Sequence, residues 1–534
     1  MKKASSNKFI RYFLVIFFLL TLTKIDFRFD EVNPGSFVDD AEYYYHTQTI
    51  AIDRDLDYSN QMPNVPYRNL NIEDTEKVLP VHAIGVGLFA SPFMFLSNEI
   101  GKIINLDSVI TFNYFIYSLI PILYLFLSIK LLKKVFELNN IFFDNFLLYL
   151  TVFGAGVTYF AFERFSMSHV YEFFATSLIL YLTAKHHNSK NINNTRLFAF
   201  FIPLLMFTAL SIRWSNYFLL LIPLFYNTFM TKTPKLIYRK LEFLTGLATG
   251  LAIFLMHTKY LHGIYTLNPS DKFLMVESRL SSDYFRFFDL TKIGDNLIYI
   301  FKSFLTINFS QEFGLFYFSP VLFLASFSIF YFLLKRDYKK SAILIGITLF
   351  PFFSTLVLNN PGYSYGYRYF YSIIPIFIAV YFTELSKHKI LRSYLKSFSI
   401  FSLISLMMFE TTSHTVLSSD YLTNSFGLYT KYVNPTYLSG VFKSIIDLDA
   451  YLNIIFTSFT GVFIIKVLNF FVEPVSFIEQ FRTVNDDILN MIIKSTEFSW
   501  TMMLFMILFL SIVSSPFYLK KGTSIFKSEK VSNV

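Results

Sequence analysis

Six acidic residues crowd a short polar stretch near the amino terminus of a chain that is otherwise apolar. The stretch is FVDDAEYYYHTQTIAIDRDLD, residues 37–57, and its acidic residues are Asp39, Asp40, Glu42, Asp53, Asp55 and Asp57. A positioned carboxylate can accept the proton of a weak nucleophile such as a hydroxyl group, and paired carboxylates can hold a hard metal ion. The adjacent pair Asp39 and Asp40 is the strongest candidate for such chemistry.

The pair also has a structural explanation. Ala41, Tyr45 and Thr49 share one face of a predicted helix, which places the two aspartates at or near its first residue. An aspartate there can cap the free backbone N–H groups, although this accounts for only one of the two.

The last three aspartates have the spacing of the start of a calcium-binding EF-hand loop. The sixth position of that loop would be Tyr58 instead of glycine, and the twelfth would be Asn64 instead of glutamate. Both positions are essential to such a loop, so we exclude it. The chain also contains no HExxH, P-loop or GxSxG sequence.

The whole composition indicates which elements must position these residues. Of 534 residues, 54% are hydrophobic and only 16% are charged, which predicts an all-α, polytopic membrane protein. The absence of cysteine excludes disulfides, thiolate metal sites and a cysteine nucleophile. The net charge of +9 lies mostly in short loops between apolar segments, where the positive-inside rule expects it, so we do not infer nucleic-acid binding.

About twelve apolar runs are long enough, or nearly so, to cross a membrane. They lie near residues 9–25, 108–130, 142–162, 169–185, 197–213, 214–230, 241–258, 314–334, 341–358, 369–386, 397–413 and 499–518. Basic residues fall in alternate loops, which predicts that both termini lie in the cytoplasm. The first run has a basic flank but no cleavage site, so we interpret it as an uncleaved signal anchor.

This topology places residues 26–107, 260–313 and 414–498 outside the cytoplasm. The acidic stretch therefore lies on the outer face, followed by an apolar segment at 83–97 that we expect to lie at the membrane interface as a helix. The segment 453–471 is predicted to be re-entrant or interfacial, the alternative being a further span. Short loops without cysteine favour a bacterial inner membrane.

Four motifs, in this order, resemble the polytopic glycosyltransferases of the C superfamily, which include protein O-mannosyltransferases and lipid A aminoarabinose transferases. They are VDDAEYYYHTQTIAIDRDLD after the first span, VLPVHAIGVGLFASPF before the second, FERFSMSHVYEFF before the fourth, and NNPGYSYGYRYFYSIIP late in the chain. The resemblance covers roughly residues 1–410. We take residues 1–413 as the membrane-embedded catalytic core, with 414–534 as a variable outer region and a last transmembrane helix.

The resemblance implies an inverting enzyme that moves a sugar from a polyprenyl-phosphate carrier to a hydroxyl group of a lipid, glycan or protein at the outer face. Asp39 matches the base, and Asp40 the second acidic position. A lipid phosphate that leaves needs cationic partners, best supplied by guanidinium groups. Arg368, beside Tyr367 in GYRYF, is the first choice and Arg213 the second, the alternative for Arg213 being a side chain that extends toward lipid headgroups.

Four further residues, Glu163, His169, Glu42 and His82, are predicted substrate contacts, and three of them have a structural alternative. Glu163 could pair with the neighbouring Arg164 or with solvent, and His169 could cap the span that it begins. Glu42 belongs to the acidic stretch, and His82 could be a satisfied structural histidine. Glu172, a turn beyond His169, is expected at membrane depth, where an ionisable residue indicates function.

No cofactor is expected. Asp39, Asp40 and Glu42 offer oxygen ligands for a divalent cation, but we do not expect a metal to be essential. Two other functions fit a polytopic chain with outer loops, namely a flippase for lipid-linked glycans and a glycan polymerase or ligase. The uncharged span centres argue against the first, and the position of the acidic stretch directly after the first span argues against the second.

Overall fold

The computed structural model describes residues 3–24, 38–61, 82–106, 108–231, 237–267, 293–309, 314–358, 368–417, 451, 454–455, 458–472 and 499–518. These residues are helical and form no strand, apart from an isolated bridge between Lys24 and Ser458. They divide into two compact units, Met1–Ile25 with Leu452–Val534 and Asp26–Tyr451. The prediction of an all-α protein is thus confirmed for the described part of the chain.

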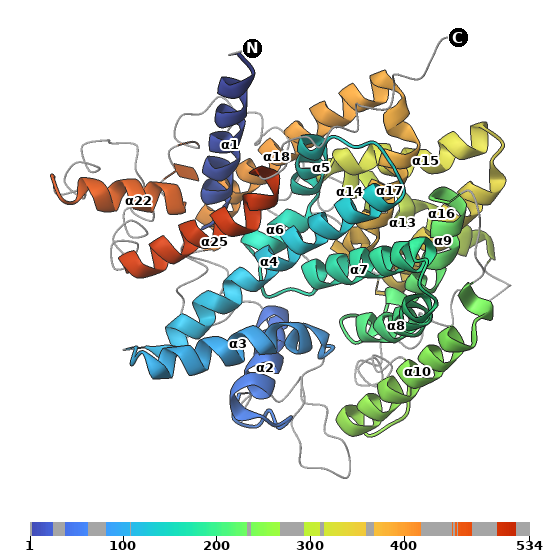
Figure 1. Cartoon of the computed structure of the whole chain (residues 1–534), viewed down its shortest axis with the longest axis horizontal. Helices are drawn as coiled ribbons and strands as arrows, with labels where there is room; N and C mark the ends of the chain where they lie inside the picture. Colours follow the sequence, from blue (N-terminus) through green and yellow to red (C-terminus); the bar gives the residue numbers. More distant parts are fainter. Residues whose placement is uncertain are drawn as a thin grey trace. The chain divides into compact units, whose positions relative to one another are not determined.

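Each predicted span coincides with a helix or with consecutive helical pieces (Figure 1). The unbroken helices are α1 (Lys3–Leu22), α4 (Val109–Leu138), α7 (His169–Asn188), α8 (Ile192–Leu210), α10 (Leu241–His262), α16 (Tyr338–Leu358), α18 (Lys389–Leu417) and α25 (Trp500–Tyr518). Among the described residues, five segments are long and apolar enough to cross a membrane: α4, α8, α10, Arg368–Lys387 and Lys389–Met407. The chain therefore has the character of a membrane protein.

Four predicted spans are broken into shorter pieces. They are α5 (Asn145–Gly154) with α6 (Val157–Phe162), η3 (Asn216–Leu221) with α9 (Ile222–Phe229), α14 (Leu315–Phe318) with α15 (Val321–Leu334), and η6 (Arg368–Ile373) with α17 (Ile374–Thr383) and η7 (Leu385–Lys387). Pro223 and Pro375 start α9 and α17, where a missing N–H costs nothing. At the α5–α6 break, a Cβ on Gly156 would lie 2.0 Å from the hydroxyl of Tyr371, so only glycine fits.

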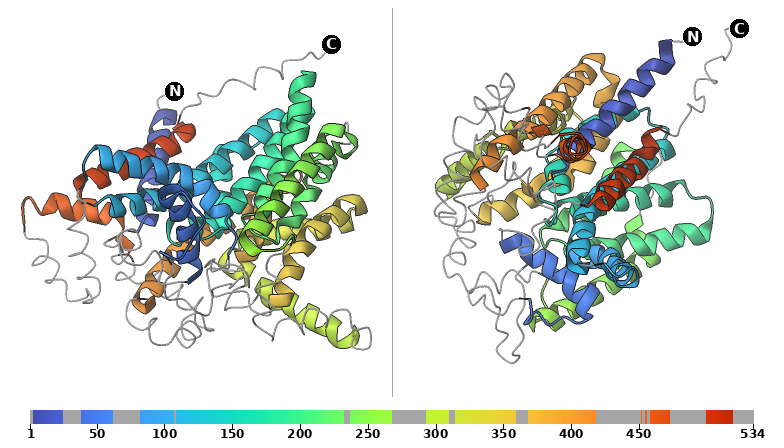
Figure 2. Two further views of the ribbon diagram at one scale, coloured as in Figure 1. Left: turned by 90° about the horizontal axis from the view of Figure 1, so that it is seen from below. Right: turned by 90° about the vertical axis from the view of Figure 1, so that its left-hand side faces the viewer.

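Helix α4 forms the centre of the larger unit and packs against α3 (Gly85–Ile103), α6 and α7. Helix α8 packs between α7 and α10, and the three run alongside one another in Figure 2. The most apolar stretch of α4 is 72% buried, against 28% for α8 and for α10. Since α10 exposes Leu241, Ile253 and Met256, its outer surface suits hydrocarbon rather than water.

Two elements come from the first predicted outer loop. Helix α2 (Val38–Gln48) continues into the π-helical turn η2 (Thr49–Asp53), and α3 follows the segment around His82. The backbone N–H of Gly85 donates to the carbonyl of Ser211 at 2.6 Å, and a Cβ on Gly85 would lie 2.5 Å from Ile212. The start of α3 is therefore fixed against the end of α8.

The smaller unit contains α1, α22 (Phe459–Leu468) and α25, and both α22 and α25 pack on α1. The backbone N–H of Phe459 donates to the carbonyl of Thr23 at 3.0 Å. Helix α22 has only 10 residues, so it is too short to cross a bilayer alone. In the larger unit, α13 (Ile293–Phe309) lies in the second predicted outer segment.

Candidate functional site

Helix α2 buries its charged side chains together with its aromatic ones. Asp40, Glu42 and His46 are only 3%, 1% and 2% exposed, and Tyr43 and Tyr44 are buried beside them. Burying an ionisable group is costly unless it is paired or hydrogen-bonded, so each of the three needs partners from other segments. The structure supplies them from the turn between α6 and α7 and from the start of α3.

Asp40 joins α2 to the α6–α7 turn. Its Oδ2 lies 2.7 Å from Nε of Arg164, which is 124 residues away in sequence, and both side chains are buried. Ser166 donates its hydroxyl proton to the Asp40 carbonyl at 2.5 Å, so Tyr117 of α4 donates to Ser166 at 2.9 Å. The pair of Asp40 and Arg164 satisfies a buried carboxylate and attaches α2 to the α6–α7 turn.

Glu42 and His46, one turn apart on α2, both hold His82. Oε2 of Glu42 accepts from the His82 backbone N–H at 3.1 Å and from its Nδ1 at 2.6 Å. Nε2 of His46 donates to the His82 carbonyl at 2.9 Å, so its Nδ1 accepts from Tyr58 at 2.7 Å. Burial lowers the pKa of His46 to about 4, so its ring stays neutral at neutral pH and keeps this pattern.

A second buried cluster lies at the start of α7. Arg213, which follows α8, donates from Nη1 to Nδ1 of His169 and to Oε1 of Glu172, both at 3.1 Å. Ser168 also donates to Oε1 of Glu172, at 2.7 Å. His169 and Glu172 are 0% and 1% exposed. Arg213 therefore turns inward and pairs with Glu172, and the alternative that it extends toward the headgroups is wrong.

Three guanidinium groups converge on this cluster. The guanidinium of Arg213 lies 4.4 Å from the ring centre of Tyr369, and that of Arg368 lies 5.4 Å from the same ring. His169 lies within electrostatic reach of Arg213, Arg368 and Arg164. Two of these groups are paired with buried carboxylates, Arg164 with Asp40 and Arg213 with Glu172, and guanidinium groups of this kind can also bind a phosphate or another polar anion.

Two buried atoms of the cluster have no hydrogen-bond partner among the described residues. They are Nε2 of His169 and Oε2 of Glu172. Because Nδ1 of His169 accepts a hydrogen bond from Arg213, its Nε2 carries the proton when the ring is neutral. One donor and one acceptor are therefore available here to a ligand with hydroxyl groups.

An apolar pocket of about 810 Å³ lies between the first-loop elements and α8 and α10. Its walls are mostly aliphatic and aromatic, and its polar lining includes Arg54, Asp55 and His257. Ser211, two residues before Arg213, also lines it. A pocket of this size can enclose part of a lipid chain beside the cationic cluster.

The aspartates that end the acidic stretch have structural partners. Oδ1 of Asp55 accepts the backbone N–H of Asp57 at 3.2 Å, and Oδ1 of Asp57 accepts that of Ser59 at 3.1 Å. Asp53 accepts from the side chains of Asn60 and Gln61. These turn contacts explain half of the acidic stretch without any chemistry.

The structure brings four of the nine predicted site residues into two groups. Asp40 lies with Arg164, while Arg213 and Arg368 lie beside Tyr369 and Arg213 donates to His169. Glu42 and His82 pair with each other, which is the structural alternative for His82. Asp39 lies in the first turn of α2, but its side chain and all of Tyr367 lie outside the described part of the structure. Within that part, no three His, Asp or Glu side chains form a group that could hold a metal ion.

Sequence reasoning missed several residues of the site. Arg164 was expected to pair with Glu163 or to stand in solvent, but it is buried and pairs with Asp40, while Glu163 is 3% exposed. Tyr369, Ser166 and Ser168 were not predicted. Tyr369 directly follows Arg368, and both serines lie within three residues before the predicted His169. Their closeness in sequence to predicted residues is the one signal that could have identified them.

Comparison with models of protein families, with curated proteins and with solved structures found no match to this chain.

Proposed function

We propose that the protein is an inverting glycosyltransferase that moves a sugar from a polyprenyl-phosphate carrier to a hydroxyl group of a lipid, glycan or protein. The observation that supports this most directly is the placement of Arg213 and Arg368 beside Tyr369, with Arg213 bound to His169, together with Asp39 on helix α2. Arg164 links the two features, because it pairs with Asp40. A proton acceptor beside a phosphate-binding group is what such a transfer needs.

In the proposed reaction, the acceptor oxygen forms a bond to the anomeric carbon as the bond from that carbon to the phosphate oxygen breaks. The carboxylate of Asp39 takes the hydroxyl proton, and the electron pair leaves with the polyprenyl phosphate. Arg213 and Arg368 stabilise the charge that develops on the phosphate. Asp40 fixes the position of α2 through Arg164, and His169 and Glu172 offer hydrogen bonds to sugar hydroxyls.

The apolar pocket of about 810 Å³ gives the carrier chain a place next to this site. Part of its rim is apolar and exposed, including Leu88, Ile253 and Tyr260. Such a rim is compatible with entry of the chain from the bilayer.

The proposal is tested by sugar transfer in purified protein reconstituted into liposomes. A panel of radiolabelled polyprenyl-phosphate sugars is offered with a crude membrane glycolipid fraction as acceptor. We expect at least one donor to yield a labelled product. Movement of the donor across the bilayer without a product would favour a flippase, and growth of a polymer on the carrier would favour a polymerase.

We also propose about twelve spans in a bacterial inner membrane, with both termini in the cytoplasm. Because the chain has no cysteine, single cysteines report each side cleanly. Asn60→Cys, after α2, should react in intact cells with a maleimide that cannot cross membranes. Asn193→Cys, at the start of α8, should react only after permeabilisation. The opposite labelling pattern would show that the proposed orientation in the membrane is reversed. Equal labelling of both variants in intact cells would contradict the proposal that the two positions lie on opposite sides.

A further inference from the structure

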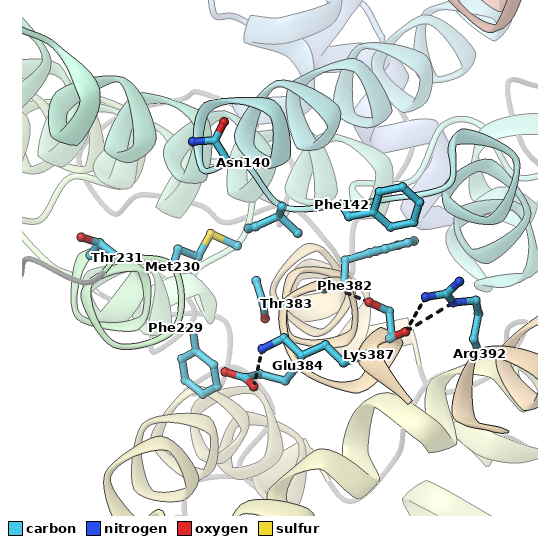
Figure 3. Close-up of a pocket in the computed structure, with 12 residues that line it drawn as sticks. Asn140, Phe142, Phe229, Met230, Thr231, Phe382, Thr383, Glu384, Lys387 and Arg392 are labelled. Carbon is cyan, nitrogen blue, oxygen red and sulfur yellow. Dashed lines mark hydrogen bonds and ion pairs between the residues drawn. The ribbon is translucent and has the colours of Figure 1, made fainter. Parts of the chain in front are cut away.

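A second pocket lies at the other ends of the helices that carry the candidate site. Tyr117 and Arg368 lie near the starts of α4 and of the α17 segment, whereas this pocket is lined by Asn140 and Glu384, which follow their ends. At 1.5 Å per residue, the two regions are roughly 30 Å apart along α4. The pocket has a volume of about 360 Å³ and is shown in Figure 3.

The pocket combines cationic side chains with an apolar wall. Arg392 and Lys387 line it together with one acidic residue, Glu384. The apolar lining comes from three segments and comprises Ile141, Phe142, Phe229, Met230 and Phe382. In Figure 3, Arg392 and Met230 lie on opposite sides of the pocket. Cationic and apolar side chains in one pocket fit an amphipathic ligand.

The positive charge of the pocket exceeds its negative charge. Oε2 of Glu384 lies 3.3 Å from Nζ of Lys387, and Oε1 lies 2.8 Å from Nζ of Lys340. Glu384 is therefore shared by two lysines, and Arg392 forms no ion pair with any described residue. The field in the pocket thus favours an anion.

Arg392 is held in place by hydrogen bonds that use only part of its donor groups. Nε and Nη2 of Arg392 both donate to the backbone carbonyl of Ser386, at 3.3 and 2.9 Å, and these bonds cap a helix end. The guanidinium group of Arg392 lies 6.0 Å from the ring centre of Phe142. The Nη1 group has no partner among the described residues. A fixed guanidinium with unused donors is well suited to phosphate oxygens.

The position of the pocket indicates where its ligand comes from. It lies where α4, α9 and η7 end and α18 begins, and both α4 and the segment Arg368–Lys387 are long and apolar enough to cross a membrane. Phe142 is 67% exposed at this level. Basic pockets between helix ends on the cytoplasmic side are typical binding sites for anionic lipid headgroups.

We propose that this pocket binds the phosphate of an anionic phospholipid from the adjoining leaflet, with Arg392 as the main contact and Phe142 beside the start of the acyl chains. In the proposed topology this is the cytoplasmic leaflet. The inference does not depend on sugar transfer, because the pocket and the candidate active site share no residue.

The test is native mass spectrometry of the detergent-purified full chain with phosphatidylglycerol or phosphatidylcholine of the same acyl chains. Wild type should bind phosphatidylglycerol about tenfold more tightly, since one charge-assisted contact has roughly that effect. Arg392→Gln should remove the preference. Lys387→Gln, which changes an exposed side chain and should leave the fold intact, should reduce it about threefold. The matched control is Arg336→Gln, a charge in the neighbouring loop outside the pocket.

Equal binding of the two lipids by wild type would overturn the proposal, as would an unchanged preference in both pocket variants. An equal loss in Arg336→Gln would mean that the general surface charge, not the pocket, attracts the lipid. Displacement of phosphatidylglycerol by inorganic phosphate would identify a free-anion site instead of a lipid site.

Discussion

Arg164→Leu should lower the free energy of unfolding by about 3–5 kcal/mol, because it leaves the buried carboxylate of Asp40 without its cation. The two side chains are 9% and 4% exposed and 2.7 Å apart. Water can replace little of the lost interaction at such burial, and the contact of α2 with the α6–α7 turn is weakened at the same time. The measurement is denaturant unfolding of the purified protein in detergent, followed by intrinsic fluorescence.

The chain offers a matched control for this variant. Arg196 lies 3.1 Å from Glu242, but its side chain is 65% exposed, so Arg196→Leu should cost less than about 1 kcal/mol. Adding Asp40→Leu to Arg164→Leu should restore part of the stability, because the stranded charge is then removed. Similar losses in both arginine variants would show that the Asp40 pair does not hold α2.

Arg213→Met should reduce sugar transfer by about 10² to 10³-fold, the effect of removing one donor from a charged transition state. It should also destabilise the protein, because Glu172 then keeps only Ser168 among its described hydrogen-bond donors. The transfer assay in liposomes measures the first effect and denaturant unfolding the second.

A double variant separates these two effects. Arg213→Met with Glu172→Gln carries no buried unpaired charge at this position, so its stability should return close to the wild-type value. Its transfer activity should stay low if Arg213 acts on the phosphate. Recovery of both stability and transfer would show instead that Arg213 only neutralises Glu172.

The sequence was sufficient to locate the helices but not their breaks. Long apolar runs predict helices because each must satisfy its backbone hydrogen bonds internally in hydrocarbon. The break between α5 and α6 lies at Ala155, whose backbone is extended, and the next residue, Gly156, leaves room for the hydroxyl of Tyr371, which is far away in sequence. The apolar run at 83–97 was predicted to be an interfacial helix because it is short, contains Pro92 and, as a span, would place the basic residues near 130 outside. The fixed start of α3 depends instead on Ser211 of a distant element.

The candidate site, like the fold, could be predicted from the sequence only in part. Residue types selected Asp40, Arg213, His169 and Arg368 as chemically important; Asp40, His169 and Arg368 are buried, and Arg213 is 15% exposed and pairs with the buried Glu172. Their partners could not be predicted, since Asp40 meets Arg164 across 124 residues and Tyr369 lies close to Arg213 from a distant segment. Such pairings arise from tertiary packing, and a local pattern carries no signal for them.

Sugar transfer by Asp39→Asn tests the central claim most directly. The variant keeps the size of the side chain and removes its basicity, so transfer should fall by about 10² to 10⁴-fold while the protein remains folded. Asp57→Asn is the matched control, because Asp57 is exposed, accepts the backbone N–H of Ser59 and should leave transfer unchanged. Equal transfer by wild type and folded Asp39→Asn would contradict the assignment of Asp39 as the base.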